Sequence, residues 1–155
     1  MKKADVKNLI GAIEKEQKAY FFSDAEYTWL SNGYFVFKTR DREIAQYIID
    51  SVNERKRKPE WQEMERLKEM ERLKDIVEDC PDAHLCADIQ TGKVLNDGRE
   101  VLILNQPEYS VWINDRFTIP KTNFYTIGAL KPVYQFVGRM EYPEAINMIL
   151  PITHN

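Results

Sequence analysis

From His84 onward the sequence is a series of short β-type runs, and this pattern constrains the fold more than any other feature. The runs are rich in β-branched and aromatic residues, and turn-forming residues such as Thr91-Gly92, Asn96-Asp97-Gly98 and Gln106-Pro107 separate them. This spacing is typical of antiparallel strands. The candidate strands read HLCADIQ, KVL, REVLILN, YSVWIN, NFYTIG, KPVYQFVG and AINMILPI. We expect a mostly antiparallel sheet, whose last run could open with a helical turn at Pro143-Glu144.

Two helices and a hairpin are predicted before this region. Residues 3–18 carry apolar side chains at helical spacing. Residues 19–39 change to short aromatic runs with turns at Asp24-Ala25 and Ser31-Asn32-Gly33, and Asn-Gly predicts a hairpin because both residues tolerate positive φ. Asp41 can cap a second helix. The buried face of that helix is predicted to contain Ile44, Tyr47, Ile48 and Val52.

The length and composition fit a single α+β domain over residues 1–155. A chain of 155 residues has the size of one domain, and 43% hydrophobic with 30% charged residues is an ordinary globular balance. Within this domain we predict a charged helical insertion at about 55–79, with a third helix from about Pro59 to Glu78.

The insertion contains the hexapeptide EMERLK twice in tandem, at 63–68 and 69–74. Its apolar residues recur every three positions, so the apolar stripe drifts by about 60° per step, and a long coiled coil is excluded. Two interpretations remain. The helix is either a charged element beside the sheet, or its spare apolar face binds a partner or a second copy of the chain. That face consists of Trp61, Met64 and Leu67.

A basic run precedes the insertion. Arg55, Lys56, Arg57 and Lys58 form either a solvated linker or a contact for phosphate, together with Lys2-Lys3. The net charge of −3 and a pI near 5.5 provide no general attraction to DNA.

The sequence contains few residues that suggest catalysis. It has two histidines, and the GxSxG, HExxH, GxxxxGK[ST] and GxGxxG motifs do not occur. We therefore expect no enzymatic activity, no cofactor and no bound metal. Two alternatives stay open: a zinc site from Cys80, His84 and Cys86 with His154 as a fourth ligand, and a metal-dependent nuclease around Asp82 and Asp88, in which Gln90 stands where such a site has lysine.

The run EYSVWINDRF contains a tryptophan that could serve as an interface anchor. As a strand it places Tyr109, Val111 and Ile113 on one face, and Ser110 and Trp112 on the other. If the first face is core, Trp112 is either displayed or packed under a helix.

The stretch VWINDRFTIPKTNFYTIGALKPVYQFVGRMEYPEAINMILPI resembles the end of a bacterial sliding-clamp domain. The matching motifs are Ile113-Asn114-Asp115-Arg116-Phe117, Lys131-Pro132-Val133 and Ile149-Leu150-Pro151-Ile152. The resemblance covers about 40 residues. It implies that the helix and hairpin of residues 3–39 are an earlier repeat of the same unit, and that the chain is a DNA-associated subunit.

From these observations we expect a non-enzymatic protein-binding module. Its origin would be a phage or mobile element, and its partner a component of host nucleic-acid or defence machinery. We expect a cytoplasmic protein that does not enter the membrane, as a monomer or homodimer. The predicted partner-binding residues are Trp61, Met64, Leu67, Arg66 and Trp112. The alternatives are the clamp-like subunit and the nuclease.

Overall fold

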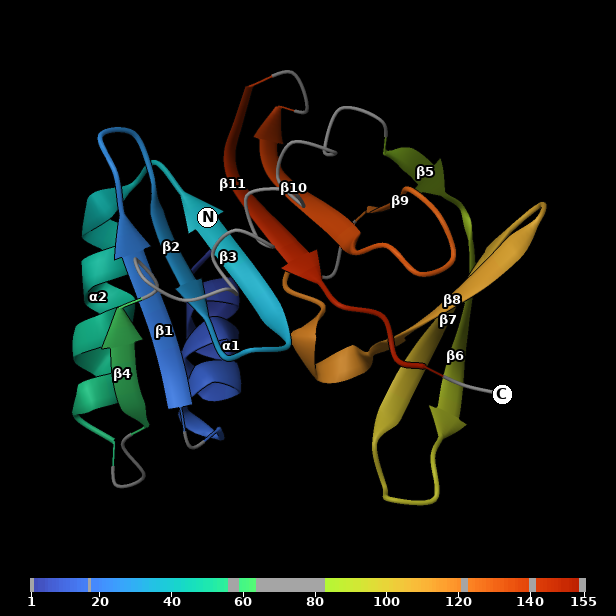
Figure 1. The fold of residues 1–155 in the computed structure, drawn as a ribbon, viewed down its shortest axis with the longest axis horizontal. Coiled ribbons are helices and arrows are strands. Elements are labelled where there is room, and N and C mark those ends of the chain that lie inside the picture. Colours follow the sequence, from blue (N-terminus) through green and yellow to red (C-terminus); the bar gives the residue numbers. More distant parts are fainter. Residues whose placement is uncertain are drawn as a thin grey trace.

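The computed structural model in Figure 1 contains two β-sheets, and two helices cover part of the larger one. It describes residues 2–16, 18–55, 59–63, 83–120, 123–139 and 142–153. In chain order the elements are α1 (Lys3–Glu14), β1 (Lys18–Ser23), β2 (Thr28–Ser31), β3 (Phe35–Thr39), α2 (Arg42–Asn53), β4 (Glu60–Glu63), β5 (His84–Cys86), β6 (Asp88–Val94), β7 (Glu100–Gln106), β8 (Tyr109–Asn114), the 3-10 helix η3 (Asp115–Phe117), β9 (Phe124–Thr126), β10 (Val133–Arg139) and β11 (Tyr142–Ile149). This is the α+β class that the sequence predicts.

The larger sheet joins the two halves of the chain. Its strand order is β4-β1-β2-β3-β11-β10-β9-β5, and the smaller sheet has the order β6-β7-β8. The seam between the halves is the antiparallel pair β3–β11, in which Phe35 lies opposite Ile149 and Thr39 opposite Ala145. The smaller sheet lies on the far side of this seam from α2 (Figure 1).

The turn predicted at Asn32-Gly33 and the cap predicted at Asp41 are confirmed, although of the Asn-Gly pair only Gly33 has a positive φ. The Asn32 side chain accepts the backbone N–H groups of Tyr34 and Phe35, while Gly33 has a φ of 94°. Asp41 caps α2 by accepting the N–H of Ile44 at 3.1 Å.

Two details of the predicted helices are wrong. The first helix ends at Glu14, because β1 begins at Lys18. Tyr47 is 61% exposed, and the buried residues of α2 are Ala45, Ile48 and Val52. Of the described helices, neither α1 nor α2 combines the length and the apolar character that a membrane crossing requires.

The predicted helix from Pro59 to Glu78 does not begin where its sequence pattern indicates. Residues 60–63 form β4, which pairs in parallel with β1, so that Trp61 lies opposite Ala19. Trp61 packs edge-to-face on Phe21, with ring centroids 6.2 Å apart, and its Nε1 donates to Asn53 Oδ1 at 2.8 Å. These tertiary contacts outweigh the local helical periodicity. The rest of the predicted helix lies outside the described residues.

The strand predictions from His84 onward are confirmed, with two changes. The runs HLCADIQ and KVL become β5 and the longer β6, which is bulged between Gln90 and Lys93. The helical turn predicted at Pro143-Glu144 is wrong, because these residues belong to β11 and pair with β10.

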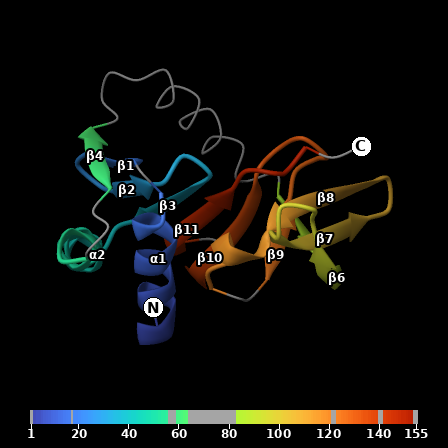
Figure 2. The same cartoon turned by 90° about the horizontal axis from the view of Figure 1, so that it is seen from below.

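Both faces of the larger sheet carry buried apolar side chains. On one face α1 and α2 cover β1–β3 (Figure 2), and β7, β8 and η3 contribute to the same core. The opposite face carries a second cluster, which contains Phe22, Trp29, Val36, Tyr134, Ile146 and Met148. Because both faces are apolar, every residue of β2 and β3 is buried, including polar Ser31 and Lys38.

Candidate functional site

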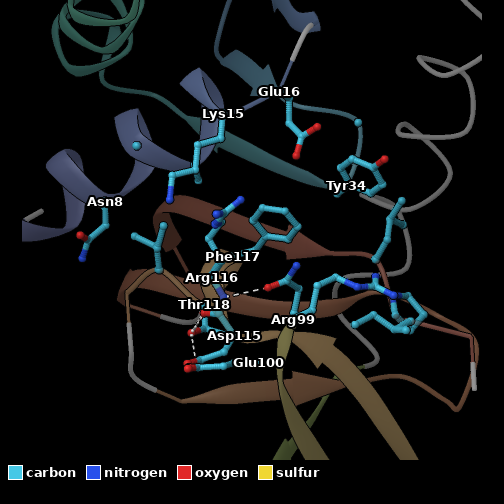
Figure 3. Close-up of a pocket in the computed structure, with 18 of the residues that line it drawn as sticks. Asn8, Lys15, Glu16, Tyr34, Arg99, Glu100, Asp115, Arg116, Phe117 and Thr118 are labelled. Atoms are coloured by element: carbon cyan, nitrogen blue, oxygen red, sulfur yellow. Dashed lines mark hydrogen bonds between the residues drawn. The ribbon is translucent and has the colours of Figure 1, made fainter. Parts of the chain in front are cut away.

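A cleft of about 1490 Å³ separates α1 from the loop that follows β8 (Figure 3). Its walls are α1, the turn between β2 and β3, the turn between β6 and β7, residues 114–119, and the segment 150–153 after β11. We call it the α1 cleft. Arg55 and Leu130 also line it, so the cleft combines residues from seven separate parts of the chain.

The first wall follows from the amphipathic pattern of α1. Leu9, Ile10, Ala12 and Ile13 are buried in the core, which leaves another side of the helix to line the cleft. That side presents Lys7, Asn8, Gly11 and Lys15. Both lysines and Asn8 are exposed.

The turn between β2 and β3 forms the second wall and is tied to α1. Asn32 is 4% exposed, and its Nδ2 donates to Ala12 O at 3.3 Å. The same side chain closes the turn, so the ring of Tyr34 has a defined position although it is 55% exposed. Tyr34 stacks on Phe117, with centroids 6.1 Å apart and an interplanar angle of 9°. The cleft therefore contains an accessible aromatic surface.

The loop that contains η3 forms the opposite wall, and buried polar side chains hold it from beneath. Asn147 Nδ2 donates to Phe117 O at 2.9 Å and to Ile119 O at 2.8 Å. Gln135 Nε2 donates to Pro120 O. Asn147 and Gln135 are both fully buried, so this part of the loop is fixed to β10 and β11.

Capping interactions also order the start of this loop. Asn114 Oδ1 accepts the N–H of Arg116 at 3.0 Å, and the hydroxyl of Thr118 donates to Asp115 O at 2.7 Å. Phe117 is 5% exposed and packs on Phe35. Because Phe117 turns into the core, Arg116 beside it is left exposed at the cleft.

Equal numbers of acidic and basic residues line the α1 cleft. The basic residues are Lys7, Lys15, Arg55, Arg99 and Arg116, and the acidic ones are Glu14, Glu16, Asp97, Glu100 and Asp115. Two pairs are already matched: Arg55 with Glu14 at 3.4 Å, and Arg99 with Asp97 at 2.7 Å. The backbone N–H of Arg99 also donates to Asp97 and, as the main cause, lowers the pKa of that carboxyl below its ordinary value.

Three cations remain at the cleft once those pairs are formed. Within the described part of the chain, Lys7, Lys15 and Arg116 form no ion pair. In Figure 3 the side chains of Lys15 and Arg116 extend toward one another across the cleft, beside the ring of Phe117. A ligand group of negative charge could contact both.

The structure does not bring the predicted partner-binding residues together. Trp61 lies in β4 at one edge of the larger sheet, and Trp112 lies in β8 of the smaller sheet, on the opposite side of Figure 1. Trp112 is half-buried, and Lys93 Nζ lies 5.6 Å from its ring centroid. The predicted alternation in β8 is confirmed, since Val111 and Ile113 are buried and Ser110 is exposed. Met64, Arg66 and Leu67 lie outside the described residues.

The residues predicted for phosphate contact, for a zinc site and for a nuclease lie only partly within the described ranges. Arg55 is exposed and paired with Glu14, while residues 56–58 lie outside the described ranges. The same holds for Cys80, Asp82 and His154. His84 and Asp88 are exposed. The thiol of Cys86 contacts Asp88 O and Asn105 O, and burial raises its pKa. Among the residues described, no three His, Cys, Asp or Glu side chains gather where they could hold a metal ion.

Sequence reasoning did not identify the cleft residues as a group. Tyr34 directly follows the predicted Asn-Gly turn, a position that does not by itself indicate a binding role. Arg116 belongs to the Ile-Asn-Asp-Arg-Phe motif, although no role was predicted for its side chain. Lys15 has no distinguishing signal in the sequence, because it resembles the other charged residues at the end of α1.

Comparisons of the chain with protein-family models, with curated proteins and with solved structures find no match. The resemblance to a sliding-clamp domain stays a prediction. The fold and the α1 cleft are therefore the basis on which a function can be proposed.

Proposed function

We propose that this chain is a protein-binding module and that the α1 cleft receives a segment of its partner. The observation that carries the proposal is the charge balance of the cleft, together with the accessible ring of Tyr34. Protein interfaces combine aromatic anchors with charges of both signs. A nucleic-acid backbone instead requires a continuous basic surface, and five carboxylates along the cleft would repel it.

We propose further that the module is cytoplasmic and comes from a phage or mobile element, and that its partner belongs to host nucleic-acid or defence machinery. The predicted surface around Trp61 would then be a second contact.

Site-specific photocrosslinking tests the proposal. A photoreactive amino acid at Asn8, which is exposed at the cleft, should give a discrete crosslinked protein in extract of the cells that express the chain. The same group at Tyr47, which is exposed on α2 and does not line the cleft, is the matched control. Tyr34→Ala should abolish the crosslink from Asn8 while the protein stays folded, because this ring is already 55% exposed.

Two outcomes would contradict the proposal. One is a crosslinking pattern that is the same from Asn8 and from Tyr47, because it would show that the cleft has no special role. The other is that the protein retards short duplex DNA in a gel at low salt, and that the Tyr34→Ala variant does not. That result would support the DNA-associated subunit instead.

A further inference from the structure

Two of the three cations that form no ion pair at the cleft, Lys15 and Arg116, come from different elements and extend toward one another. Lys15 is the C-cap residue of α1, and Arg116 lies in η3. Within the described ranges neither side chain has an ion pair, and both extend into the same space (Figure 3). Two cations that face each other without an acid between them repel, and this arrangement favours an incoming anion.

Hydrogen bonds hold the backbone that carries each of these cations. The backbone at Arg116 is held by the cap from Asn114 and by the bonds from Asn147 to the neighbouring carbonyl groups. The end of α1 is tied to the β2–β3 turn through Asn32. Because both backbones are fixed, only side-chain torsions are restricted when an anion binds, which keeps the entropic cost low.

An aromatic surface lies next to the cations. The ring of Tyr34 is stacked on that of Phe117, the residue that follows Arg116 in the chain. More than half of the surface of Tyr34 is exposed. An apolar or aromatic side chain could therefore lie on Tyr34 while a neighbouring carboxylate contacts Arg116. The cleft also carries Glu16 and Glu100, which disfavour a ligand with many negative charges.

We infer that the α1 cleft selects a partner segment in which an acidic side chain, held by Lys15 and Arg116, adjoins an apolar or aromatic residue that packs on Tyr34. This inference rests on the proposed function and specifies the chemistry of the partner. The ligand is a protein segment with one or two carboxylates. A phosphate backbone has the wrong charge density for the cleft.

A display library of random 12-residue peptides, selected on the immobilised full chain, is the probe. Peptides that also bind the double variant K15E/R116E are removed. The expected binders carry Asp or Glu within about three positions of an aromatic or large apolar residue, a spacing that one extended segment can present to the cleft. Binders without an acidic residue, or a library that yields no binder dependent on the two cations, would overturn the inference.

Charge exchange sharpens the test. For one selected peptide, Arg116→Glu should weaken binding about tenfold or more, because a contact is lost and a repulsion is added. Replacing the acidic residue of the peptide by Lys should restore part of the affinity for Arg116→Glu and reduce it for the unaltered chain. Lys18→Glu changes the net charge equally at an exposed position outside the cleft, and it should leave binding within about twofold.

The results separate this inference from the proposed function. Peptides whose binding needs Tyr34 but not Lys15 or Arg116 would overturn the inference and leave a protein-binding cleft in place. Failure of the Asn8 crosslink would contradict the proposed function itself. A 20-nucleotide single strand that displaces the peptide at equal concentration would overturn the inference, because phosphate would then be the preferred anion.

Discussion

Asn147 lies beneath the loop that presents Arg116, and it is polar although fully buried. Its surroundings determine its orientation. The carbonyl oxygens of Phe117 and Ile119 can only accept hydrogen bonds, so the amide nitrogen of Asn147 must face them. Gln135, on the neighbouring strand, makes the equivalent contact with Pro120. The residues that determine the shape of the cleft therefore lie in the core of the sheet.

Replacing Asn147 by Ala should lower the free energy of unfolding by about 2–4 kcal/mol, because two buried carbonyl groups lose their donor and a cavity opens. Urea unfolding followed by circular dichroism measures this change. Asn8→Ala, at an exposed site on α1, is the control and should stay within about 0.5 kcal/mol. A loss for Asn147→Ala as small as that of the control would show that water replaces the amide.

At the scale of elements, the parallel pair β1–β4 differs most from expectation. Pro59, which suited the first turn of a helix, instead precedes a strand at the edge of the sheet, where a missing N–H is tolerated. The side chain of Trp61 lines a groove between α2 and β1, and its indole N–H donates to Asn53 Oδ1. This one residue thus connects the strand to the helix.

Trp61→Ala should lower the free energy of unfolding by about 2–3 kcal/mol. This loss is smaller than that for truncating a fully buried tryptophan, because Trp61 is half-buried. It should also speed hydrogen exchange at the β1 amides that bond to β4, because within the described residues β4 pairs with β1 through four residues. Heteronuclear NMR measures both effects. Tyr47→Ala, an aromatic truncation at an exposed site, should change neither. Unaltered exchange in β1 would mean that β4 is held without Trp61.

The sequence predicted those elements whose signals are local. The hairpin at Asn32-Gly33, the cap at Asp41 and the strands after His84 depend on residues only a few positions apart, and the structure confirms them. β4 was not predicted, because strand pairing with β1 depends on distant residues. The helix pattern likewise predicted Tyr47 as buried. The side that the sheet covers cannot be read from the helix alone.

The α1 cleft could not be predicted for the same reason. Lys15, Tyr34 and Arg116 are far apart in sequence, and each looks ordinary in its own segment. They meet because β3 pairs with β11, which brings the loop after β8 against α1. The chemistry of the cleft is therefore a property of the topology.

For the molecule as a whole, the continuous sheet predicts cooperative unfolding. The seam between β3 and β11 is buried, and residues of α1, α2, β7 and β8 share one core. A variant with Trp29→Phe and Trp61→Phe keeps Trp112 as its only tryptophan, in the smaller sheet. Its fluorescence and the far-ultraviolet circular dichroism of the helices should give the same urea midpoint within about 0.3 M.

Phe37→Ala provides the matched perturbation. Phe37 is fully buried in β3 and lies opposite Asn147 of β11. The substitution should lower the stability by about 3–5 kcal/mol, and both signals should shift together. If only the circular dichroism shifted while the Trp112 signal stayed in place, the halves would unfold independently.

The pairing of β3 with β11 also has a consequence for synthesis on the ribosome. Residues 35–39 of β3 leave the exit tunnel long before residues 145–149 of β11 exist. Residues 39 and 145 are synthesised roughly 5–20 seconds apart at typical elongation rates, and β3 spends the later part of this interval outside the tunnel. During that time the nascent N-terminal half exposes an unpaired strand edge with phenylalanine side chains, and such an edge is a site for misassociation between chains on neighbouring ribosomes. Native folding of this region is thus completed only after β11 has been synthesised, and its yield in the cell should depend on chaperones that shield the unpaired edge of β3.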